Sequence, residues 1–132
     1  MNKKVLVDTS IIIDYSRGNG EVLLELVDLS QQGKIDLFTN SVVITEFFSG
    51  IELNNPTLYK QAFFLFESLF TCIDIGYEEA LLAGKLRRKN KIPLTTDAII
   101  ASICIINNFE LITSDKKHFS NIQDLKLYKI ES

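Results

Sequence analysis

The stretch KVLVDTSIIIDYS, residues 4–16, changes its hydrophobic pattern at Asp8 and decides the fold class. Residues 4–8 enclose the short apolar run Val5-Leu6-Val7, which is typical of a buried strand. Thr9 and Ser10 follow as residues that favour the start of a helix, and residues 11–16 continue the helix. A buried strand that passes directly into a helix is the unit from which parallel α/β sheets are built.

The same alternation of strand and helix continues along the chain. Because strands separated by helices need crossover connections, we expect a mainly parallel sheet covered on both faces. The predicted fold is therefore α/β, a three-layer α/β/α sandwich. The further strands are predicted at residues 36–40, 70–75 and 111–113 with an edge strand within 125–130, and the helices at 21–32, 41–53, 57–69, 77–89 and 95 or 96 to 107.

Composition limits the class of protein. With 132 residues, of which 46% are hydrophobic and 23% charged, the chain is expected to form a single domain over residues 1–132. Cys72 and Cys104 form no C-x-x-C pair, so neither a disulfide framework nor a thiolate zinc site is expected. No apolar run is long enough for a membrane span, and we expect a soluble, cytoplasmic protein. The net charge of −3 gives no overall attraction to nucleic acid.

Two carboxylates follow predicted strands. Asp8 ends the first strand, and Asp115 comes two residues after the strand at 111–113. Ligands of open α/β sheets bind at the carboxyl ends of the strands, so both residues are site candidates. A structural role is the alternative for each, because Asp also caps helices and stabilises turns.

Two further carboxylates lie on apolar helices. Glu46 borders the apolar face of the predicted helix 41–53, and Asp97 is the only charged residue between Lys91 and Glu110. An unpaired buried carboxylate costs several kcal/mol unless it is protonated, ion-paired or bound to a metal. The alternatives are a salt bridge from Glu46 to a neighbouring helix and, for Asp97, a favourable place near the positive end of its helix.

Four carboxylates at one edge of the sheet predict a hard divalent cation that relieves their repulsion. Oxygen ligands favour Mg²⁺ or Mn²⁺, and such an ion lowers the pKa of bound water for hydrolysis. The single histidine, His118, cannot build a histidine-rich zinc site and is expected in a turn or at the surface. There is no glycine-rich phosphate loop, so a nucleotide cofactor is not expected.

Positive charge gathers at residues 85–91 and at Lys116 and Lys117. Basic residues at the end of the helix 77–89 match its dipole, which is sufficient as a structural explanation. The alternative is a rim that follows the phosphates of RNA beside the acidic site. The candidate RNA-binding residues of that rim are Arg87, Arg88, Lys116 and Lys117.

Four segments in order, residues 5–15, 44–50, 97–101 and 111–119, resemble the PIN domain, in particular VapC-type toxins of bacterial toxin–antitoxin pairs. The resemblance implies an α/β/α sandwich in which an acidic quartet holds Mg²⁺ or Mn²⁺. The resemblance also implies two small hydroxyl residues near the metal, which have a lesser role. It implies one further acidic residue, which either supports the metal ligands or caps a helix. The quartet is Asp8, Glu46, Asp97 and Asp115, the hydroxyl residues are Ser10 and Thr113, and the supporting residue is Asp14.

The same resemblance implies endonucleolytic cutting of RNA, a homodimer, and inhibition by a small VapB-like antitoxin whose tail enters the acidic groove. One position departs from the family pattern, because Lys91 stands where glycine is frequent. Two other functions remain open: a non-catalytic RNA-binding or protein-interaction module on the same fold, and a housekeeping RNA-processing nuclease. A phosphoryl-accepting signalling domain is disfavoured, because no acidic pair precedes the first strand.

Overall fold

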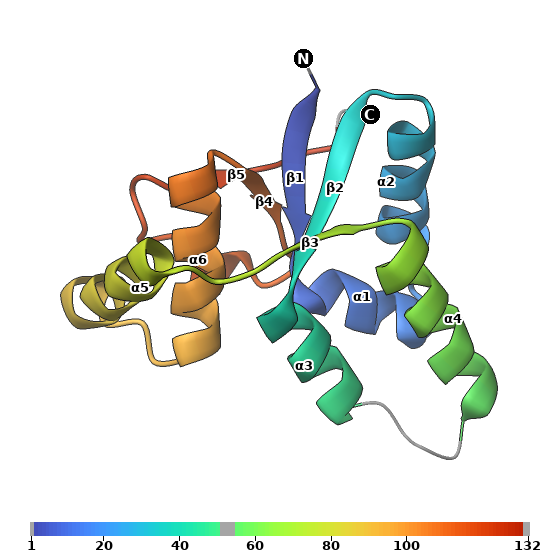
Figure 1. Cartoon of the computed structure of the whole chain (residues 1–132), viewed down its shortest axis with the longest axis horizontal. Coiled ribbons are helices and arrows are strands. Elements are labelled where there is room, and N and C mark those ends of the chain that lie inside the picture. The colour runs from blue at the N-terminus through green and yellow to red at the C-terminus, as the bar shows by residue number, and fades with distance from the viewer. Residues whose placement is uncertain (1, 51–54, 131–132) are drawn as a thin grey trace.

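A parallel sheet of five strands forms the centre of the molecule in the computed structural model, which describes residues 2–50 and 55–130 (Figure 1). The strand order is β3-β2-β1-β4-β5, and every neighbouring pair is parallel. All strands therefore end at the same edge of the sheet, as the alternating pattern predicts. The strands are β1 (Lys3–Val7), β2 (Ile35–Asn40), β3 (Thr71–Ile73), β4 (Glu110–Ile112) and β5 (Lys126–Leu127).

Helices cover the sheet on both sides. Figure 1 shows α5 and α6 on one side, α2 and α4 on the other, and α1 and α3 beyond the ends of β1 and β2. The three-layer α/β/α fold is confirmed. No helix of the described residues is long and apolar enough to cross a bilayer. The helices are α1 (Thr9–Ser16), α2 (Glu21–Gln31), α3 (Ser41–Gly50), α4 (Pro56–Ser68), α5 (Tyr77–Asn90), α6 (Thr95–Asn107) and the short 3₁₀ turn η1 (Lys116–His118).

The element bounds differ from the predicted ones mainly at the sheet edges. The strand predicted at 70–75 is confined to β3, because β3 pairs only with the last three residues of β2. The strand expected within 125–130 consists of the two residues of β5, which pair with the start of β4. The end of the helix predicted at 41–53 lies outside the described residues.

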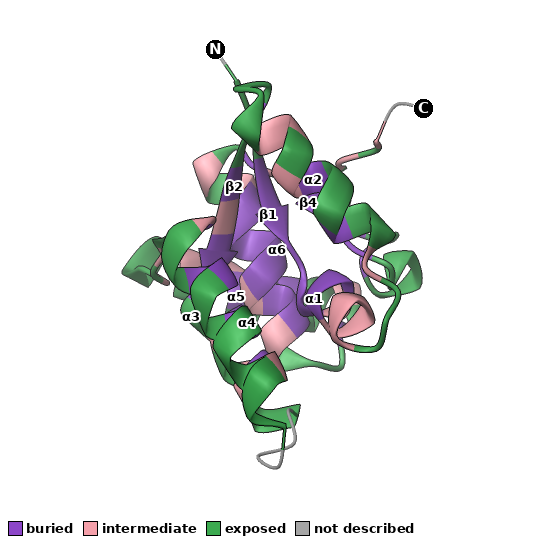
Figure 2. Ribbon diagram, turned by 90° about the vertical axis from the view of Figure 1, so that its right-hand side faces the viewer, coloured by how far each residue is buried: buried purple, intermediate pink, exposed green. Residues whose placement is uncertain are grey.

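The hydrophobic core is built around β1 and α6 and extends to the helices on the other side of the sheet, with Leu26 of α2 and Leu65 of α4 among its buried residues (Figure 2). Val5, Leu6 and Val7 of β1 have no exposed surface, which explains why this part of the strand is apolar, whereas Lys3 and Lys4 at its start are exposed. Seven of the thirteen residues of α6 are buried, consistent with a helix that lacks a polar face. Asp97 is one of those seven, and it is the charged one. The packing of α6 in the core therefore places the start of this helix at the edge of the sheet where the strands end.

Asn40 fixes the start of α3. Its side chain is fully buried, its Oδ1 accepts from the Val42 amide at 2.7 Å, and its Nδ2 donates to the Ile73 carbonyl. One amide side chain thereby joins β2, β3 and α3. Aromatic contacts then hold α3 on α4, with the rings of Phe47 and Phe66 5.8 Å apart. These contacts set the direction in which α3 presents Glu46.

Lys91 ends α5 in the left-handed backbone conformation, with φ +54°. An L-residue with a Cβ is strained there by about 1–2 kcal/mol, whereas glycine is not. We expect Lys91→Gly to raise the free energy of unfolding by about 1 kcal/mol, measured by urea denaturation. The matched control is Lys91→Ala, which removes the same side chain but keeps the Cβ. Equal stability of the two variants would contradict backbone strain at this position.

Candidate active site

Asp8 lies where β1 passes into α1 and is almost completely buried, with 5% of its surface exposed. Its Oδ2 accepts hydrogen bonds from Thr113 Oγ1 at 2.7 Å and from Ser10 Oγ at 3.0 Å. Its backbone amide donates to the Ile112 carbonyl at 3.0 Å. The alternative role as a helix cap finds no support, because the Asp8 side chain makes no capping hydrogen bond to α1. The two hydroxyls instead fix the carboxylate at the end of the sheet.

Glu46 lies on α3 and is half-buried. Its Oε1 accepts a hydrogen bond from Thr9 Oγ1 at 2.9 Å, so the residue after Asp8 orients the second carboxylate. In the part of the chain that the structure describes, no lysine or arginine forms a salt bridge with Glu46. The alternative of an ion pair to a neighbouring helix therefore finds no support there. Thr9 has a role in the site that its position in the sequence did not reveal.

Asp97 lies in the first turn of α6 and is 8% exposed. Burial raises the pKa of its carboxyl group, His118 acts in the opposite direction, and the nearby charges of Asp8 and Glu46 raise it further. The end of β1 and the helix α3 therefore bring Asp8 and Glu46 within electrostatic reach of Asp97. His118 Nδ1 lies 3.1 Å from Asp97 Oδ2.

The contact between His118 and Asp97 is a feature that the sequence did not predict. His118 ends η1 and is partly exposed, as expected of a residue in a turn at the surface. The fold nevertheless turns its ring onto a carboxylate of the candidate site. No sequence signal links the two residues, because they lie on different elements and their contact depends on how the loop after β4 packs against α6.

The raised pKa of Asp97 predicts a pH-dependent stability of the metal-free protein. A carboxyl group whose pKa is higher in the folded than in the unfolded state stabilises the fold below its unfolded pKa. That contribution is lost as the pH rises through the folded pKa. In EDTA at neutral pH we therefore expect Asp97→Asn to melt roughly 2–5 °C above wild type. The difference should shrink on acidification towards about pH 4, and a constant difference in thermal melts would contradict this origin.

Asp115 lies at the rim rather than in the buried part of the site. It is exposed, and its backbone amide donates to Thr113 Oγ1 at 2.9 Å. Thr113 therefore joins the backbone of Asp115 to the carboxylate of Asp8. Asp14 braces the same loop from α1, because its Oδ2 accepts from Ser114 Oγ at 3.0 Å. The structure thus brings Asp8, Glu46 and Asp97 together and leaves the Asp115 side chain towards solvent.

The donor set fits a hard divalent cation by its chemistry. Within residues 2–50 and 55–130, no three or more acidic, histidine or cysteine side chains converge as a ready-made metal cage. Asp8, Glu46 and Asp97 instead turn to hydroxyl groups and to His118. Asp8 and Asp97 are buried and Glu46 is half-buried, and among the described residues no lysine or arginine pairs with these three carboxylates. Such carboxylates are suited to Mg²⁺ or Mn²⁺.

The candidate RNA-binding cations differ in their surroundings. Arg87 braces the loop before α6, because its guanidinium donates to Thr95 Oγ1 at 2.8 Å and to the Pro93 carbonyl at 3.1 Å. Arg88, Lys116 and Lys117 are exposed, and among the described residues they form no salt bridge. RNA binding by these four residues stays a prediction.

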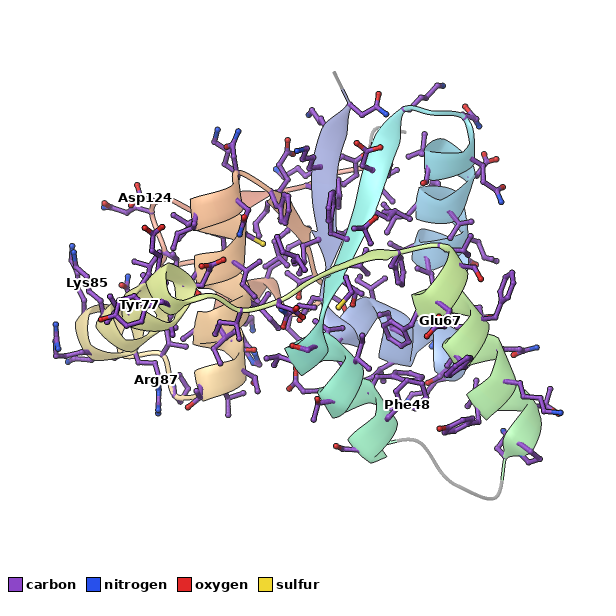
Figure 3. All side chains as sticks on the ribbon, in the orientation of Figure 1. Phe48, Glu67, Tyr77, Lys85, Arg87 and Asp124 are labelled. Carbon is purple, nitrogen blue, oxygen red and sulfur yellow. The ribbon has the colours of Figure 1, made fainter. Side chains whose placement is uncertain are left out.

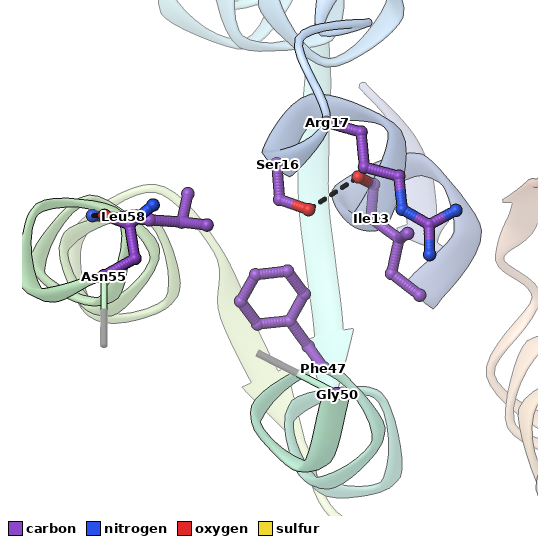
Figure 4. Close-up of a pocket in the computed structure, with 7 residues that line it drawn as sticks. All are labelled: Ile13, Ser16, Arg17, Phe47, Gly50, Asn55 and Leu58. Carbon is purple, nitrogen blue, oxygen red and sulfur yellow. Dashed lines mark hydrogen bonds between the residues drawn. The ribbon is translucent and has the colours of Figure 1, made fainter. Parts of the chain in front are cut away.

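A hollow that none of the four carboxylates lines lies between α1, α3 and α4 (Figure 4). It has a volume of about 300 Å³. Its wall combines the apolar residues Ile13, Phe47 and Leu58 with Arg17. The sequence did not predict this hollow, because its walls come from helices that meet only in the folded chain.

Comparison with known proteins places this chain in one family. The model of the PIN domain matches residues 5–125. The chain is 29% identical to Ribonuclease VapC1 of Rickettsia felis, over 97% of each chain. It is similar in structure to VapBC2 from Rickettsia felis bound to a promoter DNA fragment, with TM-score 0.79, 22% identity and coverage of 97% and 99%. For a toxin-antitoxin complex from Klebsiella pneumoniae the TM-score is 0.74, with 25% identity and coverage of 96% and 99%. The chain belongs to the PIN domain family.

Proposed function

We propose that the chain is a metal-dependent endoribonuclease, the VapC-type toxin of a toxin–antitoxin pair. The observation that carries the proposal is that Asp8 and Glu46 lie within electrostatic reach of the buried Asp97 at the end of the sheet. In the part of the chain that the structure describes, no lysine or arginine pairs with them. Relatives named Ribonuclease VapC match along almost the whole chain, which supports RNA as the substrate.

Asp8, Glu46 and Asp97 would hold Mg²⁺ or Mn²⁺, with Asp115 completing the site from the rim. When bound, the cation lowers the pKa of water and neutralises charge that develops on the phosphate. The carboxylates themselves position the reacting groups for hydrolysis of the phosphodiester bond. Asp8 is the anchor of this arrangement, because it is the most buried of the four and its carboxylate accepts two hydroxyl hydrogen bonds.

Neighbouring side chains keep the carboxylates in place. Thr113 and Ser10 hold Asp8, Thr9 holds Glu46, and His118 lies against Asp97. Ser114 and Asp14 tie the loop after β4 to α1, so that Asp115 stays near the site. These residues position the acidic groups and need not touch the RNA.

Cleavage of RNA tests the proposed function directly. The full-length chain is incubated with total RNA and tRNA in Mg²⁺, in Mn²⁺ and in EDTA, and internal cuts are mapped by primer extension. We expect cuts with either metal and none in EDTA. RNA binding without any cut would favour the non-catalytic module on the same fold, and growth that is unaffected by expression would favour a housekeeping nuclease.

We propose a small antitoxin and a second copy of the chain as protein partners. A solved relative of this fold is described as a toxin-antitoxin complex. The outer face of α4 supports a protein interface, because Tyr59, Phe63 and Phe64 are about half exposed there. The hollow beside Arg17 offers apolar contact together with a positive charge to an acidic tail. Because the proposed substrate is RNA, we propose that the protein acts in the cytoplasm. We also propose that residues 1–132 form a single domain.

A further inference from the structure

A hollow of about 430 Å³ opens directly beside Asp97. Its wall contains two lysines, Lys91 from the end of α5 and Lys117 from η1, together with His118. Leu94 adds an apolar side chain that is about half exposed. One side of the acidic site is thus bordered by positive charge.

A second hollow, of about 260 Å³, adjoins the first, and Asn121 lines both. It is lined by Lys85 and Lys89 from α5, with Asp124 as its acidic residue. Figure 3 shows Lys85 standing away from α5 on its outer side. The Nδ2 of Asn90 donates to the Asn121 carbonyl at 2.7 Å, and the Nδ2 of Asn121 donates to the Asn90 carbonyl at 2.8 Å. These reciprocal bonds join the walls of the two hollows at the end of α5.

The four lysines that line these hollows, Lys85, Lys89, Lys91 and Lys117, are called here the lysine track. Within the described ranges none of them forms a salt bridge with an acidic side chain. Arg87 of α5 differs from these lysines, because its guanidinium donates hydrogen bonds to the loop before α6. Although the net charge of the protein is negative, it therefore presents a row of lysines without salt-bridge partners among the described residues, and this row starts at the acidic site. Lysines without acidic partners are suited to a polyanion.

Backbone strain at Lys91 points the same way. Lys91 holds the left-handed conformation with φ +54°, which glycine adopts without strain. Strained residues cluster at active sites and ligand-binding positions. Glycine at this position would relieve the strain but would leave the hollow beside Asp97 without one of its two lysines.

We propose that the lysine track binds the backbone of the RNA strand on one side of the cut phosphate. This proposal rests on the ribonuclease function. Lys91 and Lys117 contact the phosphate nearest to Asp97, and Lys89 and Lys85 contact phosphates further along the strand. No tryptophan, tyrosine or phenylalanine lines either hollow, so the track holds the phosphate backbone and does not stack bases. RNA is favoured over an acidic peptide because the track begins at the residues that carry the proposed phosphodiester chemistry.

The test is the double variant Lys91→Gly with Lys117→Ala, made in the Asp8→Asn background to prevent cleavage. Binding of a short fluorescent single-stranded RNA of random sequence is measured from about 50 to 200 mM salt. Loss of two phosphate contacts should lower the slope of log affinity against log salt by about 1.4 and weaken binding roughly tenfold. The control is Lys4→Ala with Lys126→Ala, which removes two lysines from the hollow at the opposite end of the sheet. The control should bind as the parent does.

The Lys91 substitutions separate a binding defect from a folding defect. Lys91→Gly should be more stable than wild type and yet bind RNA more weakly, a combination that misfolding cannot produce. Lys91→Arg should retain the affinity. In the cleaving protein, the double variant should raise KM roughly tenfold with little change in kcat.

Equal salt slopes for the track variant and the control variant would overturn the lysine track. So would a result in which the track variant loses affinity for poly-glutamate while its affinity for RNA is unchanged, because the partner is then an acidic protein. Failure of the ribonuclease proposal looks different: wild type then cleaves no RNA with any metal, whatever the track variants bind.

Discussion

Asp8→Asn is expected to lower the rate of RNA cleavage by about 10³-fold or more, with little change in the fold. Asp8 is the most buried carboxylate of the site and stands at the end of the central strand. An amide oxygen is a far weaker ligand for a hard cation than a carboxylate oxygen, and it carries no charge to balance the ion. The loss should therefore appear in kcat, measured as initial rates on a mapped RNA substrate.

The substitution is nearly isosteric, so the surrounding hydrogen bonds can survive it. The amide oxygen of asparagine still accepts from Thr113 and Ser10, which donate to the carboxylate in wild type. The melting temperature should therefore stay within a few degrees of wild type. The matched control is Asp36→Asn. Asp36 is an exposed carboxylate near the start of β2, far from the carboxyl end of that strand. Full activity of Asp8→Asn, or equal losses in both variants, would contradict a role of Asp8 in the reaction.

Removal of divalent metal should abolish cleavage and also lower the stability of the folded protein. Burial raises the pKa of Asp97, and the charges of Asp8 and Glu46 raise it further, so Asp97 is repelled by both of these carboxylates when no cation lies among them. A cation that binds only the folded protein stabilises it by about 2.7 kcal/mol at a hundred times its Kd. Titration of the EDTA-treated protein with Mn²⁺ should therefore raise the melting temperature in a saturable manner.

The thermal readout is independent of RNA and of turnover. Asp97→Asn should lose most of the Mn²⁺-dependent increase, because one carboxylate and its charge are gone. Asp36→Asn should keep it. If Mn²⁺ and Mg²⁺ at millimolar concentration leave the melting temperature of wild type unchanged, the proposed metal site is wrong, even if RNA is cut.

The fold and the acidic residues were predictable because their signals are local. The change of pattern at Asp8 predicts a buried strand followed by a helix, and β1 and α1 confirm it. The isolated charge of Asp97 on an apolar helix predicts burial in the core, and seven buried residues of α6 confirm that too. Edge strands were predicted less well, since β3 and β5 are limited by the length of their single neighbours.

The sequence by itself determined a parallel α/β sheet and placed Asp8 and Asp115 at the ends of its strands, because hydrophobic period and strand direction are properties of short segments. Only the tertiary structure decided that Thr113 holds Asp8, that His118 contacts Asp97, and that Arg87 braces a loop while Lys91 lines a hollow. The physical reason is that these contacts join separate elements. Their geometry is set by how helices and loops pack around the end of the sheet, and no local pattern records it.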